Sequence, residues 1–320
     1  MPTSHRQKTN PLTTPPITWY VSRQLRVASM FAGIGGICHA FNDAGAKVMW
    51  ANELDKHACI TYRLNFGTDY LVEQDIKTVD YASVPDFDIL TAGFPCQAFS
   101  VAGYRKGFED ERGNLFFNIR DMLKIKRPQA FLLENVKNLV NHDKGRTFAK
   151  IQEELQTLGY SFKTKILSAR DHGNLPQTRE RTFIVGFKDE EQMRSFEFPT
   201  PIPLQQTIAD IIDFRQQQDP YYYYSPDHPY YAELDRAITK QDTIYQWRRI
   251  YVRENQSHAC PTLTANMGTG GHNVPIIRDA HGIRKLTTRE TLSFQGFPCD
   301  FKIPDNMPRT QLYKQVGNSV

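Results

Sequence analysis

The sequence lacks the patterns that would place it in a membrane, an export pathway or a disulfide-bonded fold. No stretch approaches about eighteen consecutive apolar residues, and residues 1–16 are polar and rich in Pro and Thr, without the apolar core of a signal peptide. The five cysteines are an odd number without a CxxC pair, and no His-x-His or HExxH spacing occurs. We therefore expect a soluble, cytoplasmic protein with no membrane segment, disulfide framework or metal site.

Charge of one sign is not in marked excess either. The 39 Lys and Arg residues face 35 Asp and Glu residues, which leaves a formal net charge of +4 at pH 7. This mild basic bias permits a nucleic-acid partner without requiring one. With 320 residues, of which 40% are hydrophobic, the chain is long enough for a sizeable core and a second, smaller lobe.

Short apolar runs alternate with amphipathic stretches along much of the chain. The runs that predict strands are Arg26–Phe31, Lys47–Asn52, Ile89–Ala92, Ala130–Glu134 and Thr182–Phe187. The stretches that predict helices are Ile37–Gly45, Asp55–Phe66, Leu115–Lys126 and Arg146–Leu158. Strands separated by helices predict an α/β fold with a doubly wound, mostly parallel sheet.

The same pattern divides the chain into four parts. Residues 1–24 are predicted to be a flexible N-terminal lead, because Pro and polar residues leave little to bury. The alternation spans 25–187, is broken by a proline-rich stretch, and returns near residue 284. We expect a catalytic and cofactor-binding domain at 25–187, a second domain at 188–283, and a return segment at 284–320 that completes the first domain.

A Gly-rich turn follows the first predicted strand. Residues 31–36 read Phe-Ala-Gly-Ile-Gly-Gly and lead into a helix, where backbone N–H groups can approach a ligand. Glu53, at the end of the next strand, can accept hydrogen bonds from ribose hydroxyls, and Asp75 is a candidate partner for an adenine amine. Cys38 replaces the third glycine of the dinucleotide fingerprint, so an adenosyl group without pyrophosphate fits better. The alternative is an ordinary tight turn with solvent-exposed carboxylates.

A cysteine follows the strand Ile89–Ala92. Cys96 lies in a loop at the carboxyl end of a predicted parallel strand, where open α/β sheets hold their chemistry. Such a cysteine can become a thiolate nucleophile, and the alternative is a small buried side chain. The following loop, 101–113, contains glycines and basic residues and could close over a polyanion.

An acid and two arginines complete the set of candidate polar residues. Glu134 leaves an apolar strand, an environment that raises a carboxyl pKa, and it could share a proton with a substrate ring nitrogen or simply serve a helix N-cap. Arg179 and Arg181 are two positions apart and suit a phosphate or carboxylate clamp, although a solvated strand edge explains them equally well.

In order, these motifs resemble those of the cytosine-5 DNA methyltransferases of bacterial restriction–modification systems. The matching elements are the Gly-rich turn, Glu53, Pro95-Cys96-Gln97, Glu134-Asn135-Val136, Gln177-x-Arg179-x-Arg181 and Gly317-Asn318-Ser319-Val320. They cover about residues 25–187 and 284–320. The resemblance implies a Rossmann-like methyltransferase fold, S-adenosylmethionine as cofactor with S-adenosylhomocysteine as product, no metal, and a location on DNA in a bacterial cytoplasm.

The resemblance also implies roles for individual residues. Those expected around S-adenosylmethionine are Phe31, Gly33, Gly35, Glu53, Leu54, Asp75, Ile76, Pro95, Leu115, Asn318 and Ser319. Those expected around the target cytosine are Cys96, Glu134, Arg179 and Arg181. Addition of the Cys96 thiolate to carbon 6 would activate carbon 5, while Glu134 binds ring nitrogen 3 and the amine and Arg179 holds the oxygen at carbon 2. The cytosine must first be flipped out of the duplex.

Residues 188–283 are expected to be the target-recognition domain. From residue 205 to 242 three basic residues oppose seven acidic ones, whereas from 243 to 290 seven basic residues oppose three acidic ones, so we expect double-stranded DNA on the second half. A Thr-Leu-Thr element at 262–264 opens a loop suited to major-groove edges, or to an ordinary surface. The expected DNA contacts are Ser100, Arg105, Lys106, Arg112, Thr262, Thr264 and Asn266.

Other functions compete with this hypothesis. The tRNA-methylating branch of the family shares the fold and the cysteine, but the Cys-Phe-Thr element of that branch is absent here. An NAD-dependent oxidoreductase is disfavoured by Cys38, and a non-catalytic DNA-binding relative would need neither Cys96 nor Glu134. A cognate restriction endonuclease would act on the same DNA sequence without necessarily binding this chain.

The family's Gly-Asn-Ser-Val element starts a helix that packs beside the cofactor turn. We expect such a helix after Val320, in the same polypeptide or from a second chain, and weak cofactor binding by residues 1–320 alone.

Overall fold

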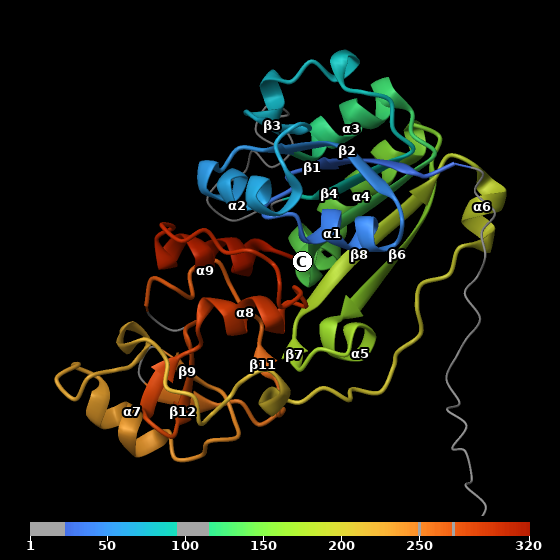
Figure 1. Ribbon diagram of the computed structural model, residues 1–320. Helices are drawn as coiled ribbons and strands as arrows, with labels where there is room; N and C mark the ends of the chain where they lie inside the picture. The colour runs from blue at the N-terminus through green and yellow to red at the C-terminus, as the bar shows by residue number, and fades with distance from the viewer. Residues whose placement is uncertain (1–22, 95–114, 249–250, 271–272) are drawn as a thin grey trace, which may run out of the picture.

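The computed structural model describes residues 23–94, 115–248, 251–270 and 273–320. A seven-stranded sheet has the order β3-β2-β1-β4-β5-β8-β6 (Figure 1). Its strands are β1 (Arg26–Met30), β2 (Lys47–Glu53), β3 (Leu71–Glu73), β4 (Ile89–Gly93), β5 (Ala130–Val136), β6 (Ser161–Ser168) and β8 (Glu180–Phe187). The first five strands of the chain pair in parallel, and β8 runs antiparallel to both of its neighbours. The predicted α/β fold with a mostly parallel sheet is confirmed.

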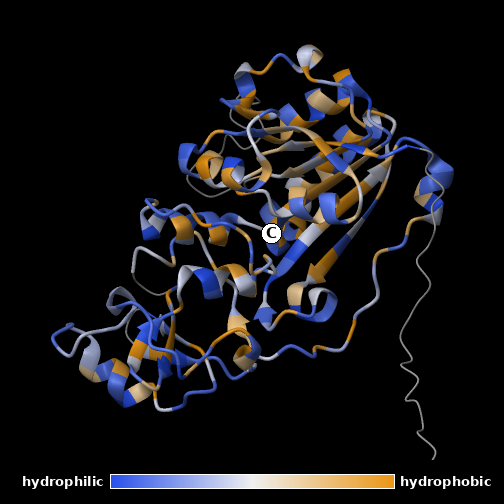
Figure 2. Ribbon diagram, viewed as in Figure 1, coloured by the Kyte–Doolittle hydropathy of each residue, from blue (hydrophilic) through white to orange (hydrophobic). Residues whose placement is uncertain are grey.

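Helices cover both faces of this sheet. They are α1 (Gly36–Asp43), α2 (Lys56–Phe66), α3 (Leu115–Lys126), α4 (Arg146–Thr157), α5 (Ala169–Gly173) and α6 (Glu190–Ser195). Because neighbouring residues of a strand point to opposite faces, Ala28 of β1 packs in the cluster that contains α3 and α4, whereas Val27 packs in the cluster that contains α1 and α2. Figure 2 shows the hydrophobic residues concentrated on the strands and on the inner sides of the helices.

The remaining described elements form a second, smaller sheet and the end of the chain. The second sheet has the order β10-β9-β12-β13 and is antiparallel. Its strands are β9 (Tyr245–Arg248), β10 (Tyr251–Glu254), β12 (Pro275–Asp279) and β13 (Gly282–Lys285). The α-helix α7 (Tyr231–Ala237) precedes them, and α8 (Thr288–Phe294) and α9 (Arg309–Asn318) follow them. The short 3₁₀ helices are η1 (Ile76–Thr78), η2 (Tyr81–Ser83), η4 (Lys137–Gly145), η5 (Ile208–Asp210) and η6 (Pro220–Tyr222).

A short parallel pair of strands joins the large sheet to the part of the chain that contains the second sheet, which we call the second region. β7 (Gln177–Thr178), which directly precedes β8, pairs with β11 (Cys260–Pro261), and Figure 1 shows the two strands side by side. The second region is therefore bonded to the large sheet next to the strand that carries Arg181.

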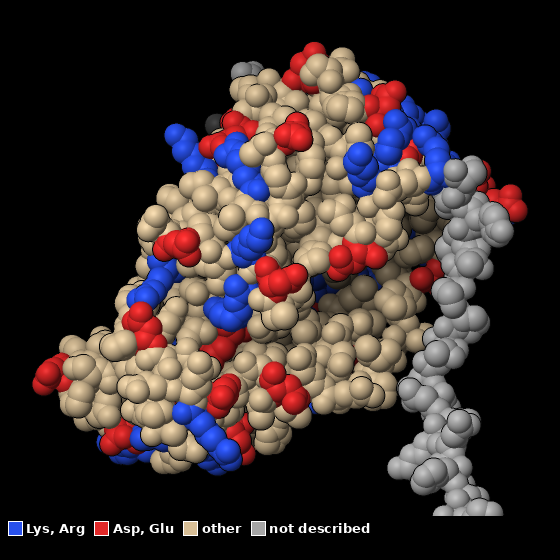
Figure 3. Space-filling view, in the orientation of Figure 1, with Lys and Arg blue, Asp and Glu red and all other residues tan. Residues whose placement is uncertain are grey.

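The basic residues of the second region are not all available to a partner. Arg284 is wholly buried between Asp279 and Glu290, with nitrogen–oxygen distances of 2.6 and 2.8 Å, and Arg278 pairs with Asp235 at 2.5 Å. Figure 3 shows acidic and basic side chains intermixed over this part of the face that it draws. The buried trio contains one basic and two acidic residues, so leaving it out of the 243–290 count gives six basic residues against one acidic residue. Arg278 of this half is paired with an acid of the preceding half.

Candidate active site

The carboxyl ends of the parallel strands meet at one edge of the large sheet. β1 and β4 are neighbours there, but the chain leaves β1 toward β2 and leaves β4 toward β5, so the edge contains a topological switch point. Open α/β sheets bind their ligands at such a point, because the diverging connections leave a crevice. Phe31 and Phe94 follow β1 and β4, Glu53 ends β2, and Glu134 lies two residues before the end of β5.

The Gly-rich turn is held by Glu53. The N–H of Gly33 donates to Oε2 of Glu53 at 2.8 Å, and Oε1 accepts the N–H groups of Leu54 and Asp55, each at 2.8 Å. Phe31, Gly33 and Gly35 have left-handed φ angles of 57°, 59° and 92°. A Cβ at Gly33 would meet no atom within 4 Å, so the turn presents backbone to open space, as a ligand cradle requires.

Other residues that we expect around the cofactor lie at the ends of neighbouring strands. Asp75 follows β3 and accepts the N–H of Lys77 at 3.0 Å, while Ile76 is buried and the side chain of Leu54 is exposed. Asn52, to which the sequence analysis assigned no role, is buried and donates to the carbonyls of Val72 and Gln74 at 3.0 and 2.8 Å. An Asn inside an apolar strand is the signal that could have identified it, since a buried amide needs partners.

The buried acid and an arginine form the second part of the site. Glu134 is only 6% exposed, and its Oε1 lies 2.9 Å from Nε of Arg181 on the adjacent strand β8. Burial raises the pKa of Glu134, against the opposing effects of Arg181 and Arg179. The pKa of Arg181 is lowered by burial, although the neighbouring Glu134 opposes this. The carboxyl group can therefore hold a proton at a higher pH than an exposed glutamate.

The end of β4 lies against this acid. Gly93 is opposite Glu134 in the β4–β5 register, and a Cβ at Gly93 would come within 3.2 Å of Oε2 of Glu134. The side-chain nitrogen of Asn135 donates to the carbonyl of Phe94 at 3.0 Å. Cys96 follows two positions later and lies outside the described residues, as do Pro95, Ser100, Arg105, Lys106 and Arg112.

Arg179 does not accompany Arg181 at the acid. Its Nη1 donates to the carbonyl of Leu263 at 3.0 Å, and Nη2 donates to the carbonyls of Gly317, at 3.5 Å, and Ser319. Burial lowers the pKa of Arg179 to about 9, and Arg181 adds to this while Glu134 opposes it. The guanidinium remains charged at neutral pH and binds two segments that are distant in sequence, at residue 263 and at residues 317–319.

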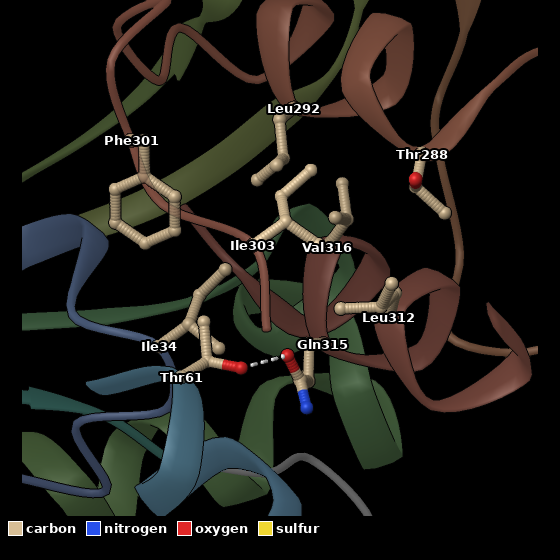
Figure 4. Close-up of a pocket in the computed structure, with 9 residues that line it drawn as sticks. All are labelled: Ile34, Thr61, Thr288, Leu292, Phe301, Ile303, Leu312, Gln315 and Val316. Carbon is tan, nitrogen blue, oxygen red and sulfur yellow. Dashed lines mark hydrogen bonds between the residues drawn. The ribbon is translucent and has the colours of Figure 1, made fainter. Parts of the chain in front are cut away.

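Residues of α8 and α9 pack against the Gly-rich turn. Figure 4 shows Ile34 of the turn facing residues of α8 and α9 around a cavity of about 10 Å³, room for about one water molecule. The Thr61 hydroxyl donates to Oε1 of Gln315 at 2.8 Å. Asn318 ends α9, rather than starting a helix, and the Ser319 hydroxyl donates to the carbonyl of Gln315 at 2.9 Å. Leu115, the first residue of α3, is half-buried.

The Thr-Leu-Thr element is engaged with its own chain. The hydroxyl of Thr262 donates to the carbonyl of Thr178 at 2.5 Å, and that of Thr264 donates to Oδ1 of Asn266 at 2.7 Å. Asn266 is exposed. Within the described ranges, no three His, Cys, Asp or Glu side chains come together in a group that could hold a metal ion, and no helix is long and apolar enough to cross a bilayer.

A glycine turn held by an acid therefore lies at the switch point, and a buried carboxylate–arginine pair begins two strands away from it. The chain belongs to the C-5 cytosine-specific DNA methylase family, whose model matches residues 25–320.

Individual relatives agree with this family. The chain is 54% identical over 299 residues to the type II methyltransferase M.Bsp6I of Bacillus sp. (strain RFL6), covering 92% of this chain and 94% of that protein. It is 42% identical over 295 residues to the type II methyltransferase M.NgoBI of Neisseria gonorrhoeae, covering 92% and 89%. The crystal structure of the Dnmt2 methyltransferase of S. pombe is similar in fold, with a TM-score of 0.70 at 21% identity over 93% of this chain and 94% of that one.

Proposed function

We propose that this chain is the modification enzyme of a type II restriction–modification system. It transfers a methyl group from S-adenosylmethionine to carbon 5 of a cytosine in a specific duplex DNA sequence. The observation that carries the proposal is the buried Glu134–Arg181 pair beside the end of β4, which lies three residues before Cys96. Relatives at 54% and 42% identity are both named type II methyltransferases, which favours DNA over the tRNA substrate of the alternative.

S-adenosylmethionine would bind at the switch point and supply an electrophilic methyl group. The Gly-rich turn and Glu53 suit its ribose and amino-acid portions, because a carboxylate has about four lone-pair sites and Glu53 uses three for the chain itself. Asp75 and Ile76 would adjoin the adenine. Leu54, Pro95, Leu115, Asn318 and Ser319 complete the proposed surroundings.

The Cys96 thiolate would attack carbon 6 of the flipped-out cytosine. A carbon–sulfur bond forms, and the electron pair of the carbon 5–carbon 6 double bond becomes available at carbon 5, which takes the methyl group. Transfer of the carbon 5 proton to a water molecule and departure of the thiolate then restore the double bond. Glu134 would donate a proton or hydrogen bond to ring nitrogen 3 as sulfur adds, and its raised pKa supports that role.

We assign the oxygen at carbon 2 to Arg181 rather than to Arg179. Arg181 already contacts Glu134, and its side chain is 15% exposed, so it borders the space that a base would enter. The terminal nitrogens of Arg179 bond to backbone carbonyls instead. This assignment departs from the expectation formed on the motif, because the motif does not distinguish two arginines that are two positions apart.

DNA recognition is proposed for residues 188–283, which include Thr262, Thr264 and Asn266. Ser100, Arg105, Lys106 and Arg112 are proposed to contact the phosphates and sugar near the flipped base. The partner in the cell would be a restriction endonuclease that cleaves the same sequence when it is unmethylated.

Bisulfite sequencing of DNA from a methylation-deficient bacterial host that expresses the chain tests this proposal. We expect 5-methylcytosine at one position of one short sequence, and none with Cys96→Ala. Calorimetry with S-adenosylhomocysteine should show that Cys96→Ala still binds the cofactor product. Undiminished methylation by this variant would refute the covalent mechanism, and absence of 5-methylcytosine with the wild-type chain would refute the function.

A further inference from the structure

Leu263 stands at the junction of the second region and the large sheet, and both of its backbone polar groups are bonded to side chains. Its N–H donates to Oε1 of Gln177 at 3.3 Å, and its carbonyl accepts Nη1 of Arg179 at 3.0 Å. Leu263 is 1% exposed and lies outside any strand or helix. Buried backbone groups outside regular structure need such partners, so these two side chains replace a strand neighbour.

The three residues before Leu263 are bonded to the same short stretch, Gln177–Thr178. β11 pairs with β7, the hydroxyl of Thr178 donates to the carbonyl of Cys260 at 3.4 Å, and that of Thr262 donates back to the carbonyl of Thr178. The segment 260–263 is therefore bonded to 177–179 residue by residue.

The opposite side of this segment is closed by the end of α9. A Cβ at Gly317 would lie 2.2 Å from the carbonyl carbon of Thr264, so helix and peptide are in direct contact. Arg179 also bonds to the carbonyls of Gly317 and Ser319. One guanidinium thus fixes the distance between α9 and Leu263.

Gln177, Arg179 and Arg181 occupy alternate positions of one extended stretch and so share a face. Arg181 reaches Glu134, whereas the other two reach Leu263. The distance between the reacting pair and the Thr-Leu-Thr element is consequently set by the few residues from Gln177 to Arg181.

We propose that Gln177 and Arg179 are positioning residues for DNA recognition. They hold the backbone of Leu263, and so place Thr262 and Thr264 at a defined position relative to Glu134 and Arg181. The recognised bases are thereby held at a fixed distance from the flipped cytosine. This inference rests on the proposed function, and it gives Arg179 a role that does not include contact with the cytosine.

Two variants and a matched control test the proposal. Arg179→Lys keeps the charge but loses the planar fork that bonds to three carbonyls, and Gln177→Met keeps the approximate volume without the hydrogen bonds. Arg170→Lys is the control, because Arg170 also donates to a carbonyl of the second region, that of Ser257 at 3.4 Å, but not to Leu263. The measurements are KM for unmethylated plasmid DNA, the single-turnover rate at saturating DNA, affinity for S-adenosylhomocysteine, and the bisulfite pattern.

We expect Arg179→Lys to raise KM for plasmid DNA about tenfold or more, the size of one lost hydrogen bond to a charged group. We expect Gln177→Met to raise it about two- to tenfold, the size of one lost neutral hydrogen bond. The single-turnover rate should stay within a few-fold of the wild-type rate, and the affinity for S-adenosylhomocysteine should be unchanged. DNA sequences that differ from the recognised one at single bases should become methylated. The control should behave as wild type.

Three results would overturn the inference. A lower single-turnover rate for Arg179→Lys at unchanged KM would make Arg179 a substrate contact. Parallel losses of single-turnover rate, cofactor affinity and melting temperature would make it a general structural residue. If all the measured quantities equalled those of the wild type, Arg179 would have no role in positioning. If Arg179→Lys does not fold, Gln177→Met decides by the same criteria. If the wild-type chain makes no 5-methylcytosine, the function fails, but plasmid-binding affinities of the same variants still test the positioning role.

Discussion

Nε of Arg181 lies 2.9 Å from Oε1 of Glu134, and the side chains are 15% and 8% exposed. The pair joins the end of β5 to the beginning of β8, because the antiparallel strand starts at the edge where the parallel strands end. A charge pair with so little solvent makes strong and directional contacts with whatever enters beside it.

Replacing Glu134 by Gln should slow the chemical step while leaving DNA binding intact. The amide cannot supply the proton or the charge-assisted hydrogen bond to the cytosine ring, so we expect the single-turnover rate to fall by about 10²-fold or more. Glu180→Gln is the control, because Glu180 is close in sequence to Arg181 but forms an exposed pair with Lys137. Equal rates for the two variants would remove Glu134 from the reaction.

Glu53→Gln should weaken the binding of S-adenosylhomocysteine by about 1–3 kcal/mol, the value of a hydrogen bond to a charged group. The substitution removes the charge that holds Gly33 and that would accept from ribose. Glu73→Gln is a matched control, since Glu73 is opposite Glu53 in the β2–β3 register but pairs with Arg63 at 2.7 Å. Titration calorimetry on both variants measures the difference, and equal affinities would place the ribose elsewhere.

Two glycines of one turn should tolerate alanine unequally. Both have left-handed φ angles, which cost an L-residue about 1–2 kcal/mol. A Cβ at Gly33 meets open space, whereas one at Gly35 would lie 2.3 Å from the ring of Phe66. Urea unfolding should therefore show a loss of about 1–2 kcal/mol for Gly33→Ala and about 1–3 kcal/mol more for Gly35→Ala. A reversed order would contradict the geometry of the turn.

Asp88 should stabilise the fold in a pH-dependent way. It accepts from Arg23 at 2.6 Å and from the N–H of Arg26 at 2.9 Å. Burial acts to raise its pKa, but the bonds from Arg26 and the charges of both arginines outweigh it, so the pKa lies below 3.8. The stabilisation is therefore complete above pH 3.8 and is lost as the pH falls through the lowered pKa.

Asp88→Asn should lower the free energy of unfolding at pH 7 by about 1–3 kcal/mol. The difference from wild type should shrink in acid, because the wild-type carboxylate becomes protonated there. Unfolding curves at several pH values measure this, and a difference that persists below the lowered pKa would contradict the ionic origin.

Much of the large sheet was predictable because its strands are buried on both faces and read as apolar runs. Each predicted helix and strand agrees with the structure to within two residues at either end. β6 was missed, since all of its residues are only half-buried at the sheet edge and its sequence, SFKTKILS, mixes polar and apolar residues.

The partners of Arg179 were not predictable in the same way. They lie 84 to 140 positions further along the chain, and no local pattern identifies them. The two arginines are equivalent by spacing and type, and only the tertiary fold directs one to carbonyls and the other to Glu134.

Gln177 and Arg179 bind the backbone of Leu263 and not its side chain, and this affects how the sequence of the protein can evolve. An N–H and a carbonyl are present whatever side chain occupies the position, so the bonds from Gln177 and Arg179 do not themselves depend on the side chain at residue 263. Substitutions around Leu263 can accumulate, and whole segments can be exchanged between relatives, without a compensating change at Gln177 or Arg179. We therefore expect new DNA specificities to arise by divergence within this region while the catalytic strands stay the same.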